Sequence, residues 1–214
     1  TTIDASKNYG LSLALGSAVV PLREIVPAYA ALANQGQQYQ LLSVKHINNK
    51  FGKSIFNSPT SSKHAISKEG AFLISSSLSD NSARSSIFGS SLTVGGHTVA
   101  VKTGTTNDNR DAWTIGYNPE YVVGVWVGNN DNTAMRSGGS DMAGPILRNN
   151  KTEIIAGRKE VEFAAPSSVV QRDVCKNNGN LADKKGPNTY VEYFMAGALP
   201  KRWRYVGTNK YGVW

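Results

Sequence analysis

The sequence predicts a protein of the α/β (α+β) class, in which helices flank an antiparallel sheet and a loop-rich appendage follows. Three observations lead to this prediction. Apolar residues recur at helical spacing after Pro21, strand-like runs joined by short connections occupy residues 97–128, and periodicity fades after Gly157. We therefore expect a core domain at residues 1–157 and a basic extension at residues 158–214, built of loops or of a small β-structure.

The first strong helix is expected over residues 21–35. Its apolar residues are spaced three and four apart: Leu22, Ile25, Val26, Tyr29, Leu32 and Ala33. Pro21 suits the first helical turn, because its missing N–H would have no partner within the helix there. Gly36 suits the C-terminal cap, where a left-handed backbone is common.

The stretch between this helix and the sheet is expected to contain a hairpin and a second helix. Residues 40–47 and 53–56 predict two strands joined by a turn at residues 48–52. Ser67 is a good N-cap for the second helix. Residues 75–91 then contain nine serines in seventeen positions. Since serine hydroxyls compete with the helical backbone for hydrogen bonds, we expect this segment to be irregular.

The most strand-like part of the chain follows. Residues 97–102, 112–117 and 121–128 predict three strands of an antiparallel meander. The third strand is apolar at successive positions, which is typical of a sheet that is covered on both faces. Asp141 is expected to cap a final helix.

The chain is basic, with 23 Lys and Arg against 15 Asp and Glu and a net charge of +8. The excess is +3 in residues 1–150 and +5 in residues 151–214. Such a charge favours anionic partners. No zinc module, helix-turn-helix or RNP signature is present, so nucleic acid is not expected among them.

Several other classes are excluded by composition. A single cysteine, Cys175, rules out an internal disulfide framework, and three histidines without ligand spacing disfavour a metal site. We expect no metal and no cofactor. No apolar run approaches the roughly 18 residues of a membrane span, and no signal peptide or initiator Met is visible. The chain is therefore expected to be a mature or truncated piece of a longer protein.

Lys102-Thr103-Gly104 is the most informative motif. K-T-G is typical of serine acyl-enzymes that act on β-lactams and D-alanyl peptides. A lysine at the end of an edge strand supplies a fixed positive charge, and the Thr103 hydroxyl can bind a carboxylate. Gly104 lets a substrate backbone approach, and the N–H of Thr105 can serve as an oxyanion donor.

The surroundings of the motif extend this interpretation. Residues 102–117, KTGTTNDNRDAWTIGY, and residues 122–129, VVGVWVGN, resemble the transpeptidase domain of class A (bifunctional) penicillin-binding proteins. Further similar stretches lie at residues 12–17, 28–36, 79–84, 88–89, 173–175, 179–182 and 192–200. The resemblance covers nearly the whole chain and implies part of the penicillin-binding, β-lactamase-like transpeptidase fold.

The resemblance also implies an activity: a serine-type D,D-transpeptidase that cross-links peptidoglycan stem peptides through an acyl-serine. β-Lactams would acylate the same serine. Lys102 and Thr105 would be catalytic, and Thr103, Gly104 and Thr105 would bind the substrate. It further implies a location on the extracytoplasmic face of the bacterial membrane, with a membrane anchor and a glycosyltransferase domain upstream.

One element of the family pattern is missing. The family places S-x-x-K, which carries the nucleophile, before S-x-N and K-T-G, but residues 60–63 read T-S-S-K and no serine stands three positions before a lysine. Ser79-Asp80-Asn81 spells S-D-N, yet it lies only 21 positions before Lys102, follows a predicted helix and aligns with a non-catalytic segment. We therefore expect the nucleophile to lie upstream of residue 1 and the isolated chain to be inactive.

Two other functions remain open from the sequence. The first is a non-catalytic module that binds the cell wall or a membrane surface through its basic charge. The second is a self-contained, β-lactamase-like hydrolase that uses Ser79 as its nucleophile. The second is disfavoured, because no lysine stands three positions after Ser79.

Overall fold

The computed structural model describes residues 3–4 and 6–201. The chain divides into two compact units, Thr1–Ala164 and Ala165–Trp214. The sequence places the division after residue 157, seven residues before the division in the structure. Residues 158–164 belong with the first unit, because the Phe163 ring packs edge-on against Tyr117 at a centroid distance of 5.7 Å.

The first unit is built on a three-stranded antiparallel sheet in the order β5-β6-β7, which confirms the predicted meander. Its strands are β5 Ala100–Thr105, β6 Asp111–Tyr117 and β7 Val122–Gly128. Its helices are α1 Leu22–Ala33, α2 Lys68–Ser79, α3 Asn81–Phe88 and α4 Gly139–Ile155, with 3-10 turns η1 Leu11–Leu15 and η2 Asn107–Asn109. β5 begins and ends three residues later than predicted, so the K-T-G motif lies inside the strand.

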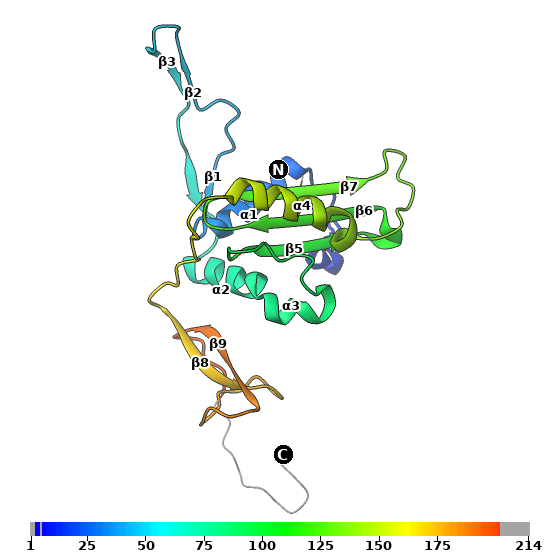
Figure 1. The fold of residues 1–214 in the computed structure, drawn as a ribbon, viewed down its shortest axis with the longest axis vertical. Helices are drawn as coiled ribbons and strands as arrows, with labels where there is room; N and C mark the ends of the chain where they lie inside the picture. Colours follow the sequence, from blue (N-terminus) through cyan, green and yellow to red (C-terminus); the bar gives the residue numbers. More distant parts are fainter. Residues whose placement is uncertain (1–2, 5, 202–214) are drawn as a thin grey trace, which may run out of the picture. The chain divides into compact units, whose positions relative to one another are not determined.

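Helices cover both faces of this sheet, as the apolar third strand predicts (Figure 1). A Cβ added to Gly116 would lie 2.8 Å from Leu147 of α4, and one added to Gly124 would lie 2.5 Å from Val26 of α1. Gly124 is the cross-strand partner of Ile115, the neighbour of Gly116. Because successive residues of a strand face opposite sides, α1 and α4 pack on opposite faces.

The core contains a buried lysine. Lys151 of α4 is fully buried, and its Nζ donates to Asn118 Oδ1 at 2.8 Å and to the Tyr121 carbonyl at 2.9 Å. Burial lowers the pKa of Lys151 to about 8, and the nearby Glu120 charge opposes this shift. On the other face, Tyr117 is also fully buried, and burial raises its pKa to about 12.

The helices follow the sequence except in the serine-rich segment. Pro21 is the N-cap of α1, one residue outside the helix, and Ser67 caps α2 as predicted, accepting the Gly70 N–H at 3.1 Å. The prediction that residues 75–91 are irregular is wrong, because α2 continues to Ser79 and α3 follows. Two hydrogen-bond patterns are compatible with a helical backbone in this segment. Asp80 accepts the Ala83 N–H as the N-cap of α3, and serine hydroxyls donate to carbonyls three residues back within the helices.

A slender ribbon, which we call the arm (residues 37–64), extends from the first unit (Figure 1). Its strands are β1 Gln37–Tyr39 paired with β4 Ser62–His64, and β2 His46–Asn48 paired with β3 Ser54–Asn57. The predicted hairpin is confirmed, although its first strand is shorter than predicted and its second strand begins and ends one residue later. Asn49 holds the turn, since its Oδ1 accepts the N–H groups of Phe51 and Lys53, both at 3.0 Å.

The second unit contains an antiparallel pair of strands, β8 Val169–Cys175 and β9 Thr189–Met195. Val174 is fully buried and forms an isolated bridge with Leu181. Cys175, at the end of β8, is partly buried and unpaired. Among the residues that the structure describes, no helix is both long and apolar enough to cross a membrane.

Candidate active-site strand

The four residues predicted to form the site lie consecutively on β5. In the described part of the chain, no strand pairs with the outer side of β5, so it is an edge strand. Lys102 and Thr105 are exposed, while Thr103 and Gly104 are half-buried. The K-T-G-T run is therefore open to a ligand along one side, and the sheet fixes its backbone.

The hydrogen-bond pattern of the sheet determines which backbone groups face the open side. Thr106 N donates to Asp111 O at 3.1 Å, and Thr105 lies opposite Ala112 in the register. In an antiparallel ladder, bonded and non-bonded pairs alternate. Thr105 and Thr103 therefore direct their N–H and C=O groups away from β6. Consistent with this, Lys102 Nζ donates to the Thr103 carbonyl at 2.6 Å.

The side chains of the motif divide between the two faces of the sheet. Lys102 lies opposite Ile115, on the face that α1 covers, whereas Thr103 lies opposite Thr114, on the face that α4 covers. Thr105 shares the face of Thr103 because it is two residues further along. The structure thus places the side chains of Thr103 and Thr105 on the same face of the sheet. The Lys102 side chain starts from the opposite face and comes near them only at the open edge of β5.

The start of α4 supports the motif through contacts that the sequence did not reveal. Gly139 N donates to Thr105 Oγ1 at 2.9 Å, and the buried Thr114 Oγ1 donates to Gly139 O at 2.8 Å. A Cβ on Gly139 would lie 2.6 Å from the Gly104 carbonyl oxygen, so only glycine permits this approach. The prediction that Asp141 caps this helix is wrong, since Gly138 is the N-cap of α4. The adjacent glycines before a helix were the available signal.

The loop after the motif is held by Asp111. Its Oδ2 accepts the Thr106 hydroxyl at 3.0 Å, its N–H donates to Thr106 Oγ1 at 2.8 Å, and its Oδ1 accepts Trp126 Nε1 at 2.9 Å. Both carboxylate oxygens therefore have partners. This arrangement assigns Asp111 the role of fixing the end of β5.

The S-D-N triplet has a structural explanation at each position. Ser79 ends α2 and donates to the Ser76 carbonyl, and Asp80 caps α3. Asn81 Oδ1 accepts hydrogen bonds from Arg84 and from the Thr93 hydroxyl. None of these three side chains has a lysine among its hydrogen-bond partners in the described residues, which argues against a hydrolase built on Ser79.

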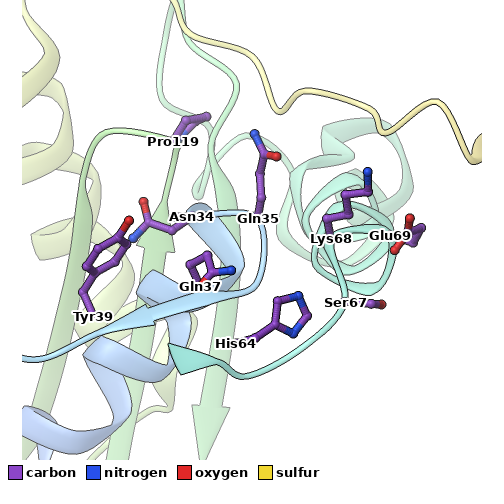
Figure 2. Close-up of a pocket in the computed structure, with 10 residues that line it drawn as sticks. Asn34, Gln35, Gln37, Tyr39, His64, Ser67, Lys68, Glu69 and Pro119 are labelled. Carbon is purple, nitrogen blue, oxygen red and sulfur yellow. The ribbon is translucent and has the colours of Figure 1, made fainter. Parts of the chain in front are cut away.

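A polar hollow of about 660 Å³ lies elsewhere in the first unit (Figure 2). Its lining comes from the end of α1, from β1 and β4, from the start of α2 and from the turn between β6 and β7. Figure 2 shows Tyr39, His64 and Lys68 around it. No residue of β5 contributes to it, so this hollow is separate from the K-T-G strand.

Known structures share this fold. Penicillin-binding protein 1A from Haemophilus influenzae superposes with a TM-score of 0.75, covering 89% of this chain and 34% of that chain at 24% sequence identity. The family model described as the penicillin binding protein transpeptidase domain matches residues 4–150, and that of the penicillin-binding protein 1A C-terminal domain matches residues 165–205. The chain therefore belongs to the penicillin-binding protein transpeptidase family, as the C-terminal part of the class A type.

Curated relatives agree with this assignment. Penicillin-binding protein 1A/1B of Bacillus subtilis (strain 168) is 34% identical over 81% of this chain and 21% of its own length. Penicillin-binding protein 2D of the same strain is 28% identical over 88% of this chain and 28% of its own length. The chain thus spans between a fifth and a third of the length of these relatives.

Proposed function

We propose that these residues form one wall of the active site of a serine-type D,D-transpeptidase that cross-links peptidoglycan stem peptides. The observation that supports this most is the open edge of β5, where the K-T-G-T run directs backbone groups outward beside an exposed lysine. An extended peptide that approaches this edge meets donors and a positive charge at fixed positions. Membership of the transpeptidase family agrees with this reading.

Each residue of the motif has a role in the proposal. Lys102 supplies a positive charge to the proton network around a serine from a preceding S-x-x-K segment. Thr103 and Thr105 donate their hydroxyl hydrogens to the carboxylate of the substrate or drug, and Gly104 leaves room for its backbone. The Thr105 N–H stabilises the oxyanion that forms when the serine oxygen attacks the carbonyl carbon.

The reaction proceeds through an acyl-enzyme. The serine oxygen bonds to the carbonyl carbon of the penultimate D-alanine, the peptide bond breaks, and D-alanine leaves with a proton. The amine of a second stem peptide then takes the acyl group and frees the serine. A β-lactam acylates the same serine, and its opened ring remains attached. The proposal includes a location on the extracytoplasmic face of the membrane, and it includes a membrane anchor and a glycosyltransferase domain upstream, since the chain belongs to the class A type.

The first test uses the 214 residues alone. Incubated with a fluorescent penicillin, they should form no stable covalent adduct, because no serine stands in an S-x-x-K arrangement. Intact-mass spectrometry checks this directly. A stoichiometric adduct on any serine would show that the chain carries its own nucleophile and would contradict the proposed division of the site.

The second test uses a longer form of the protein that includes a preceding S-x-x-K. Lys102→Ala should slow acylation by penicillin on the order of 100-fold, the effect typical of removing a charged or oxyanion-stabilising donor. Lys159→Ala, at an exposed lysine outside the sheet, is the control and should leave the rate within about twofold. Equal rates for both variants and the unmodified protein would exclude the role proposed for Lys102.

A further inference from the structure

The arm has an unusual charge pattern. Residues 40–64 contain four lysines, Lys45, Lys50, Lys53 and Lys63, and no aspartate or glutamate. The four lysines take part in no ion pair within the described residues. The positive charge is therefore uncompensated along the whole projecting ribbon.

The same ribbon exposes large apolar side chains. Phe51, in the turn between β2 and β3, is 81% exposed, Ile55 is 64% exposed and Leu41 is 63% exposed. Phe51 directly follows Lys50 and lies two residues before Lys53, and Lys50 Nζ lies 5.0 Å from the centre of its ring. Large exposed apolar patches mark protein or membrane interaction sites. A two-stranded hairpin without a core also has little stability of its own.

The lysines and the exposed apolar side chains of the arm together indicate which kind of partner it binds. A soluble anionic polymer would bind the lysines but would leave Phe51 and Ile55 in water. An apolar protein groove would cover those side chains but would leave the lysines without counterions. The interface of an anionic bilayer accommodates both, because apolar side chains enter the headgroup region while lysines meet lipid phosphates.

We propose that the arm binds the surface of an anionic lipid bilayer, with the turn around Phe51 inserted at the headgroup level. The second unit is a weaker candidate for this contact, since its described residues carry basic side chains interspersed with Asp173, Asp183 and Glu192. The arm concentrates a single sign of charge beside apolar groups. This surface is separate from the K-T-G strand and does not depend on the proposed catalytic role.

The test is co-sedimentation of the full 214-residue chain with vesicles. Vesicles of phosphatidylcholine that contain phosphatidylglycerol should retain the protein at low salt, and pure phosphatidylcholine vesicles should retain at least tenfold less. The triple variant K45Q/K50Q/K53Q should lose at least tenfold in affinity. The matched control K184Q/K185Q/K201Q, at exposed lysines of the second unit, should change it by less than about twofold.

A second variant separates lipid insertion from simple charge attraction. Phe51→Ser should weaken vesicle binding about fivefold or more, while Phe51→Trp should bind and shift its fluorescence to shorter wavelength as the ring leaves water. Circular dichroism should show that all variants remain folded. Absence of phosphatidylglycerol-dependent binding, equal losses in the two triple variants, or an unchanged affinity of Phe51→Ser would each overturn the proposal.

Discussion

The β5–β7 sheet and the arm are both antiparallel and joined by short connections, yet they differ in what surrounds them. The sheet is closed by α1 on one face and by α4 on the other, with glycines at the contact points. In the described part of the chain no layer covers the arm, and both strands of its outer hairpin are exposed at every position. Both regions have a hydrogen-bonded ladder, so the ladder alone does not distinguish them. The comparison shows that the stability of the sheet comes from the helices packed on its two faces.

The largest expected effect is found by comparing two glycines that have similar positive φ angles. Gly36 and Gly52 have φ values of +87° and +82°, but a Cβ on Gly36 would lie 1.8 Å from Ile66 O, while one on Gly52 would meet nothing within 4 Å. Gly36→Ala should lower the free energy of unfolding by about 3 kcal/mol or more. Gly52→Ala should cost about 1 kcal/mol, confined to the hairpin. Urea denaturation, with hydrogen exchange for the hairpin, measures both; equal global losses would refute the comparison.

The next effect concerns the buried lysine of the sheet layer. Because the pKa of Lys151 is lowered in the folded state to about 8, the unfolded chain holds more protons above that pH, and stability should rise between pH 8 and about 10.5. The rise from pH 7 to 9.5 should be about 2 kcal/mol.

The matched variant is Lys151→Met, which removes this pH dependence. It also leaves Asn118 Oδ1 and the Tyr121 carbonyl without their donor, which should cost about 2 kcal/mol at pH 9.5. The measurement is the difference between the two denaturation profiles over that range. Parallel pH profiles of the two proteins would show that Lys151 is not buried as described.

A smaller effect is expected at the loop that fixes the end of β5. Trp126→Phe removes the N–H that Asp111 Oδ1 accepts, and should cost about 1 kcal/mol. A double-mutant cycle with Asp111→Ala isolates this bond, and the coupling energy should be of the same size. A coupling energy near zero would mean that Trp126 acts through packing alone.

The smallest effect is expected from apolar residues of the arm. Ile47 and Phe56 are cross-strand partners and are 45% and 44% exposed. Replacing both by serine should change the global free energy of unfolding by less than about 0.5 kcal/mol. By contrast, Leu147→Ala beneath the sheet should cost about 3 kcal/mol, since this side chain is fully buried. A loss of similar size in the arm variant would show that the arm packs on a core.

Local patterns predicted the meander, the α1 helix, the Ser67 cap and the K-T-G strand because each depends on neighbouring residues. The helices over residues 68–88 were missed in part, because the effect of the serines depends on where each hydroxyl points. The contact between Gly139 and Thr105 joins residues 34 positions apart and leaves no periodic signal. The burial of Lys151 could not be predicted from the sequence either, since a single lysine on a helix usually faces water.

The hydrogen bond from Gly139 to Thr105 has a consequence for selectivity. A hydroxyl oxygen whose lone pair already receives an N–H has its remaining hydrogen free to point outward. Because one of its two lone pairs is occupied, the Thr105 hydroxyl is biased towards donating to an incoming group, and the carboxylate that we propose as its ligand would benefit from this bias. The backbone N–H of a glycine 34 residues away thus influences which kind of polar group the Thr105 hydroxyl favours.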